Sequence, residues 1–101
     1  DHVLLHNNAA WLLATTENPP APPAEAVRLA QTALALGDEG HPELLDTLAA
    51  AHAANGDFDA AIQTAQQALQ LLSSASPENQ ALRESIQHRI VFYRQRKPYR
   101  E

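Results

Sequence analysis

Apolar and small side chains recur at helical spacing on both sides of a short turn in the middle of the chain. The stripe before the turn comprises Leu45, Leu48, Ala49 and His52, and the stripe after it comprises Ala61, Ala65, Ala68, Leu69 and Leu72. Residues three and four apart share one face of a helix, so the pattern predicts two helices joined by the turn Asn55-Gly56-Asp57. Because small side chains dominate both stripes, we expect the two backbones to approach closely as a helical hairpin.

Three further helices are predicted by the same kind of pattern. Residues 2–15 leave little polar face, which is typical of a helix that is buried on more than one side. After a proline-containing loop at 16–22, a helix over about 23–36 directs its alanines inward, and Gly37 is expected as its left-handed C-cap. The last helix covers about 77–96 with the apolar stripe Leu82, Ile86, Ile90 and Tyr93, and a tail follows at 97–101.

The chain also contains an internal repeat. Ala26, Ala30, Ala33 and Leu34 recur as Ala61, Ala65, Ala68 and Leu69 at an offset of 35 residues. Ala9-Ala10 corresponds to Leu48-Ala49 at an offset of 39, and the difference of four is the extra length of the proline loop. A repeating helix-turn-helix unit of about 34 residues is the period of the tetratricopeptide repeat.

The second unit, at about 42–73, resembles a tetratricopeptide repeat in its signature positions. The matching residues are Leu45, Leu48, Ala49, Gly56, Phe58, Ala61 and Ala68, whereas His52 stands where the family usually has tyrosine. The first unit, at about 2–37, is degenerate because its turn is expanded. Several segments, among them the ending YRQRKPYRE, are similar to the C-terminal end of bacterial multi-repeat proteins, in which the last helix is a cap.

The expected fold is therefore all-α and a single domain over 1–101: a right-handed solenoid fragment of two hairpins and a capping helix, five helices in all. One hairpin cannot bury its own alanine-leucine face, whereas stacked neighbours can. The predicted capping helix fits this role because one side is apolar and the other carries Arg83, Glu84, Gln87, His88 and Arg94. The apolar pattern begins directly after Asp1, which suggests a fragment of a longer protein.

Composition and charge exclude some functions. Residues 1–82 hold one base and ten acids, a charge of −9, and residues 83–101 hold six bases and two acids, a charge of +4, which together give −5. An acidic body argues against nucleic-acid binding, which needs a basic surface. The chain has no cysteine for thiolate chemistry, and no apolar run approaches the ~20 residues of a membrane span. These numbers do not fix the compartment.

Candidate catalytic and metal-binding residues are few. His2 and His6 share a helical face, but a zinc site needs more ligands than this pair provides. His52 lies on a packing stripe. It is either a ligand or pH switch, or a partly buried histidine that stands in place of tyrosine. The acidic pairs, Asp57 with Asp59 and Asp38 with Glu39, lie in turns where aspartate favours helix starts. With no nucleophile-base set apparent, we predict no enzyme, no cofactor and no metal.

The resemblance implies a concave groove lined by the first helix of each unit. By matching positions, the groove would comprise Asn7, Asn8, Trp11, Glu43, Asp46, Thr47, Ala50 and Ala53. Trp11 is either a recognition anchor in this groove or a core residue, and the sequence leaves both open. These positions lack the basic residues of the family's carboxylate clamp and carry acids instead, so a basic or polar peptide fits better than an acidic one.

Three hypotheses for function follow. The first is a non-catalytic module that binds a peptide or partner protein in the groove. The second is a structural role in which the apolar N-terminal helix packs on the parent protein or on another copy, through Val3, Leu4, Leu5, Leu12 and Leu13. The third and weakest is a metal-dependent enzyme that uses His2, His6 and a further ligand. The partner itself cannot be named from the sequence.

Overall fold

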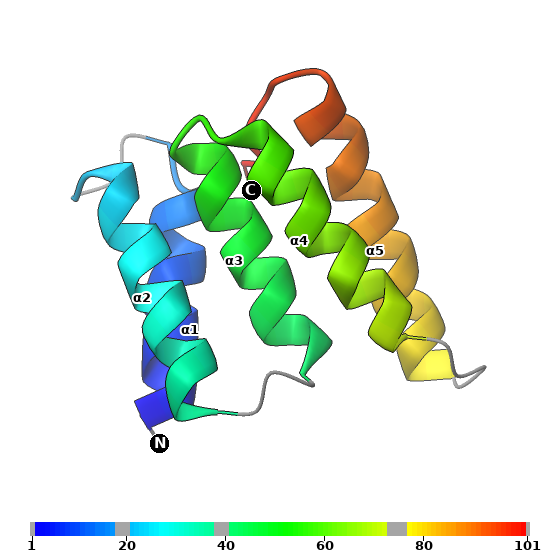
Figure 1. Cartoon of the computed structure of the whole chain (residues 1–101), viewed down its shortest axis with the longest axis horizontal. Coiled ribbons are helices and arrows are strands. Elements are labelled where there is room, and N and C mark those ends of the chain that lie inside the picture. Colours follow the sequence, from blue (N-terminus) through cyan, green and yellow to red (C-terminus); the bar gives the residue numbers. More distant parts are fainter. Residues whose placement is uncertain (1, 18–20, 38–40, 73–76, 101) are drawn as a thin grey trace.

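Every regular element that the structure describes is an α-helix. The computed structural model describes residues 2–17, 21–37, 41–72 and 77–100 (Figure 1). Within these ranges the five helices are α1 (His2–Thr15), α2 (Pro23–Leu36), α3 (Pro42–Ala54), α4 (Phe58–Leu71) and α5 (Pro77–Arg94). The all-α class, the helix number over the described residues and the order of the elements are therefore as predicted from the sequence.

Each helix packs against its neighbour in the chain. The pairs in contact are α1 with α2, α3 with α4 and α4 with α5, and α3 also packs on both α1 and α2. Figure 1 shows α2, α3, α4 and α5 side by side, with α1 behind α2. The molecule measures 38 × 34 × 20 Å along its principal axes. Helix α3 is thus the shared element, because it lies against the first helix pair on one side and against α4 on the other.

The helices begin where the sequence predicts. Pro23 and Pro42 open α2 and α3, where a missing backbone N–H leaves no hydrogen bond unmade. Asp57 is the N-cap of α4, and its Oδ1 accepts a hydrogen bond from the backbone N–H of Ala60 at 3.3 Å. For the last helix, the sequence favours Ser76 as the N-cap before Pro77, but Ser76 lies outside the described residues.

Helices α3 and α5 end in the same way. After α3, Gly56 has a φ of 83° and its N–H bonds to the Ala53 carbonyl, while the Asp57 N–H bonds to the His52 carbonyl. After α5, Arg96 has a φ of 59°. The N–H groups of Arg96 and Lys97 bond in turn to the carbonyls of Tyr93 and Phe92, both at 3.0 Å. Both ends are Schellman motifs, which satisfy the last carbonyls and reverse the chain.

The predicted left-handed cap at Gly37 is wrong, since its φ is −99°. A glycine is needed here because a side chain would not fit, and not because of the backbone conformation. A Cβ at this position would lie 3.1 Å from Leu44 Cδ1 and 3.2 Å from Val3 Cγ1. Gly37 therefore lets side chains of α1 and α3 come close to the end of α2.

Small residues fill two clusters of the core, one on each side of α3. The first comprises Ala10, Ala14, Ala26, Ala30, Ala50 and Ala51. The second comprises Ala49, Ala53, Ala61, Ala65, Ala68, Leu72, Ile86, Ile90 and Tyr93. The alanine seams let helices approach closely, and in the second cluster Ile86 and Tyr93 supply the bulk.

A matched pair of substitutions tests the left-handed turn after α5. Arg96→Gly and Arg96→Ala both remove the exposed ion pair between Arg96 Nη1 and Asp59 Oδ1, which is 2.9 Å long. Only the glycine variant also relieves the left-handed conformation, which costs a residue with a Cβ about 1 kcal/mol. We expect urea unfolding to show Arg96→Gly as the more stable variant by about 1 kcal/mol. Equal free energies of unfolding would contradict the turn.

Candidate functional site

A buried ion pair joins α3 to α5. Arg89 Nε donates a hydrogen bond of 2.9 Å to Asp46 Oδ1, and Arg89 Nη2 contacts Asp46 Oδ2. The side chains of Arg89 and Asp46 are only 9% and 8% exposed. Two parallel contacts between a guanidinium and a carboxylate fix the orientation of both groups. The pair therefore holds Arg89 in one position on the side of α5 that faces α3.

Two aromatic rings flank the Arg89 guanidinium. Its central carbon lies 5.2 Å from the centroid of the Trp11 ring and 5.3 Å from the centroid of the Tyr99 ring. The two rings are tilted against each other with their centroids 6.1 Å apart. A cation within about 6 Å of a ring centroid is attracted to the ring face. Arg89 therefore connects α3, α1 and the tail at one point.

The C-terminal tail folds back onto α1. The ring of Tyr99 also packs edge-on against Phe92 of α5, with centroids 5.7 Å apart. Arg100 Nη1 donates hydrogen bonds to the carbonyls of Ala14 and Thr16, both at 3.1 Å. The last carbonyls of a helix lack intrahelical donors and carry its negative dipole end, so a cation is favoured there. In Figure 1 the tail passes behind α4 on its way to this contact.

The predicted groove residues fall into three groups. Asp46, Thr47, Ala50 and Ala53 are buried. Asn7 and Trp11 are half-buried, while Asn8 and Glu43 are exposed. Trp11 packs against the first alanine cluster on one side, and its ring lies beside Arg89 and Tyr99 on the other. The structure thus brings Trp11 and Asp46 together through Arg89, and the tail lies over this place.

The predicted signature residues serve packing. Ala49, Ala61 and Ala68 are fully buried, Leu45 and Phe58 pack against the second cluster, and Leu48 packs against the first. Gly56 takes the left-handed conformation of the turn. All of them except Leu48 therefore stabilise the hairpin of α3 and α4, and Leu48 stabilises the packing of α3 on the first helix pair.

The sequence reasoning missed the roles of Arg89, Tyr99 and Arg100. The sequence analysis counts Arg89 only among the six bases of residues 83–101, although it lies between Ile86 and Ile90 on the buried stripe of α5. A charged residue beside an apolar stripe is a signal for a buried pair, and its partner Asp46 was predicted only as a groove residue. Nothing in the sequence indicates that Tyr99 and Arg100 reach α1, since this depends on the turn at Arg96.

Burial shifts the acid-base behaviour of this region. Desolvation raises the pKa of the Asp46 carboxyl, against the lowering effect of the Arg89 charge and with a further rise from Glu43. Desolvation likewise raises the pKa of the Tyr93 hydroxyl, which is buried and has no hydrogen-bond partner among the described residues. Burial therefore disfavours the charged forms of both Asp46 and Tyr93, and the charge of Arg89 acts against this effect.

The histidines do not form a metal site in the described residues, where no group of three or more His, Cys, Asp or Glu could hold an ion. His6 Nδ1 lies 2.7 Å from the backbone carbonyl of His2. His52 is half-buried on α3, and desolvation lowers its pKa, with Asp57 acting in the opposite direction. His52 thus has the features of the partly buried histidine that the sequence left open.

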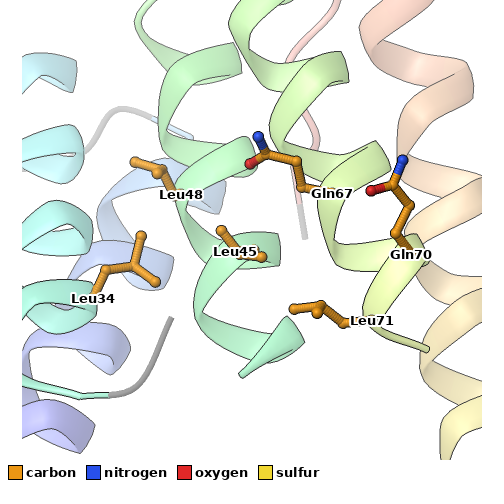
Figure 2. A pocket seen from close by; sticks show the side chains of 6 residues that line it. All are labelled: Leu34, Leu45, Leu48, Gln67, Gln70 and Leu71. Atoms are coloured by element: carbon orange, nitrogen blue, oxygen red, sulfur yellow. The ribbon is translucent and has the colours of Figure 1, made fainter. Parts of the chain in front are cut away.

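Apolar side chains are open to solvent in at least two places on the part of the chain that the structure describes. One is a pocket of about 440 Å³ lined by Leu34, Leu45, Leu48, Gln67, Gln70 and Leu71. Figure 2 shows its leucines on α2, α3 and α4, with the two glutamine side chains on α4. The other is the outer side of α1, where Leu4, Leu5 and Leu12 are exposed. Beside them a pocket of about 430 Å³ is lined by Ala9, Leu12, Leu13 and Thr16.

Compared with protein-family models, with curated proteins and with solved structures, the chain matches none. Among the described residues, no helix is both long enough and apolar enough to cross a membrane.

A double-mutant cycle tests the buried ion pair. Asp46→Asn removes the negative charge but keeps the shape, so the Arg89 guanidinium loses its counter-charge. Removing one partner of a buried pair costs about 3 to 5 kcal/mol. We expect urea unfolding to show a loss approaching this size for Asp46→Asn. We expect part of it to be recovered when Arg89→Met is added.

The control for this cycle is Glu25→Gln, which removes the same charge from the exposed pair of Glu25 and Arg28. An exposed pair contributes about 0 to 1 kcal/mol, so the free energy of unfolding of this variant should stay close to that of the unaltered chain. A similar loss in the two acid-to-amide variants would contradict the buried pair.

His52 predicts a dependence of stability on pH. Its pKa in the folded chain lies below the ordinary value of 6.5, so just below pH 6.5 the unfolded chain binds a proton there more readily than the folded chain does. Stability is therefore lost as the pH falls below this value. Between about pH 7.5 and 5.5 we expect the free energy of unfolding to fall further in the parent chain than in His52→Gln. Parallel curves would contradict the burial of His52.

Proposed function

We propose that this chain is a non-catalytic protein–protein interaction module, built as a right-handed solenoid fragment of tetratricopeptide type. Its main contact surface in this proposal is the outer side of α1, defined by Leu4, Leu5 and Leu12. The occupant is an antiparallel pair of α-helices with small and aliphatic residues along its seam. The observation that carries the proposal is the register between α1 and α3.

The two helices correspond at an offset of 39 residues, which pairs Leu44 with Leu5 and Ala51 with Leu12. In α3, which packs on α1 and α2, Leu44 is 6% and Ala51 is 0% exposed. In α1, the matching Leu5 is 66% and Leu12 is 63% exposed. The face by which α3 rests on a preceding helix pair thus has an apolar counterpart on α1 that faces solvent.

The chemistry of this face suits a helical partner. The segment His2–Thr15 contains no Asp, Glu, Lys or Arg, so no unpaired charge would be buried on docking. Each leucine side chain that becomes fully buried contributes about 1.5 to 3 kcal/mol. Three neighbouring exposed leucines on one helix are therefore a favourable contact for an apolar partner surface.

The occupant follows from the same register. The surface on which α3 rests is the α1–α2 pair, whose contribution to the first cluster is alanine at Ala10, Ala14, Ala26 and Ala30. A face of α1 that matches the face of α3 is complementary to another helix pair of this kind. The far side of α5 is a poor partner in this respect, because it presents Glu84, Gln87 and His88 to solvent.

A tandem chain tests this docking without knowledge of the natural partner. A second copy of residues 2–40 placed directly before residue 2 puts the original α1 in the register of α3, at the offset of 39. We expect the tandem chain to be more stable to urea than the parent chain. Leu5→Glu with Leu12→Glu in the original α1 should remove this gain, yet leave the parent chain nearly unchanged, because there both leucines are exposed.

The matched control is Leu36→Glu at the end of α2, where the leucine is exposed but lies on a helix that packs on α1 and α3. It should be tolerated equally in the parent and the tandem chain. If the double glutamate substitution lowers the free energy of unfolding of the tandem chain no more than that of the parent chain, the outer side of α1 does not receive a helix pair.

A further inference from the structure

We infer that Tyr99 and Arg100 are an internal ligand, and that the site they occupy recognises an aromatic residue followed by arginine in a partner protein. The site, called here the tail site, consists of Trp11, Arg89 and Phe92 together with the carbonyls of Ala14 and Thr16. The inference rests on the proposed function only in that the chain is a protein-binding module. It concerns a surface separate from the outer side of α1.

The aromatic half of the tail site has three walls. The Tyr99 ring lies 5.7 Å from the Phe92 ring and 6.1 Å from the Trp11 ring, both measured between centroids. The Arg89 guanidinium carbon lies 5.3 Å from its centroid. Edge-on and tilted ring contacts and a cation over a ring face are each specific for an aromatic side chain.

The walls do not depend on the tail for their position. Arg89 is fixed by its two contacts with Asp46, and Trp11 packs against the alanine cluster of α1, α2 and α3. Phe92 is part of α5 and packs against the second cluster. A site built on helices in this way remains formed when its ligand leaves, which lowers the cost of binding another ligand there.

The half of the tail site that receives the cation is the end of α1. Arg100 reaches the Ala14 and Thr16 carbonyls through its side chain, with both hydrogen bonds 3.1 Å long. Backbone carbonyls at a helix end accept from any arginine that is placed beside them. The order aromatic then arginine is therefore what the site reads, and the acidic body of the chain favours a basic ligand.

The tail itself is held by few contacts. In the described part of the chain, its backbone hydrogen bonds end with the Lys97 N–H, so beyond this point the side chains of Tyr99 and Arg100 hold it. The turn that directs it to α1 places Arg96, a residue with a Cβ, in the left-handed region. Such an arrangement allows a ligand from another protein to compete with the tail.

A peptide titration tests the inference. The probe is the tetrapeptide Lys-Pro-Tyr-Arg with blocked ends, which copies residues 97–100. The readout is the indole N–H signal of Trp11 in nuclear magnetic resonance spectra, which is unambiguous because the chain has one tryptophan. We expect a saturable shift in the full chain carrying Tyr99→Ala and Arg100→Ala. The unaltered chain should need about tenfold more peptide, because its own tail occupies the site for most of the time.

Two controls separate recognition from unspecific binding. A peptide with alanine in place of its tyrosine and arginine should give no saturable shift with either protein. The variant Arg94→Ala, which removes an exposed cation of α5 outside the tail site, should respond like the unaltered chain. The variant with Arg100→Ala alone carries a smaller change and should bind the peptide with intermediate affinity. It replaces the double variant in the titration if the double variant does not fold.

The absence of a saturable shift in both tail variants would overturn the inference, and so would equal affinities of the unaltered and the doubly substituted chain. Leu5→Glu with Leu12→Glu should leave peptide binding unchanged. Failure of the tail site and failure of the docking face on α1 can therefore be told apart.

Discussion

The arrangement of the chain's C-terminal third depends on one buried ion pair. Helix α5 packs along α4, and the contact between Arg89 and Asp46 adds a fixed link from α5 to α3. Because two charges taken out of water gain little net free energy from each other, the pair contributes more to geometry than to stability. The rise in the pKa of the Asp46 carboxyl has the same origin, since desolvation outweighs the charge of Arg89. With Arg89 held in one place, Trp11 and Tyr99 can both lie against it.

Close packing of small residues supplies the stability that the ion pair does not. Alanine seams on both sides of α3 let it pack closely in two clusters at once. Ala50 and Ala51 lie in the first cluster, and Ala49 and Ala53 lie in the second. In well-packed interiors, added volume is as costly as lost volume, so these positions leave little room for larger side chains. Gly37 obeys the same constraint at the end of α2.

Helix positions could be predicted from the sequence because they are set by local signals. Prolines at 23 and 42, Asp57 before α4 and the spacing of the alanines each act within a turn or two of helix. The cap at Gly37 was mispredicted because a glycine after a helix is typical of a left-handed backbone conformation. Here the glycine instead leaves room for side chains of α1 and α3. The candidate site was predicted only in part. Trp11 and Asp46 were identified by matching positions, but their partner Arg89 is 43 residues from Asp46.

The two proposed surfaces differ in what covers them. In the proposed stack of helix pairs an inner pair is covered on both sides, whereas the outer side of α1 leaves Leu4, Leu5 and Leu12 exposed. At the other end, α5 carries a polar outer side, and the tail returns over the inner one. In the two proposals the exposed leucines on α1 receive the apolar seam of a helix pair, whereas the tail site selects by ring geometry and by hydrogen bonds from a cation. The proposed module therefore combines a broad contact face with a narrow recognition site, and the Schellman turn at Arg96 directs the tail into the narrow site.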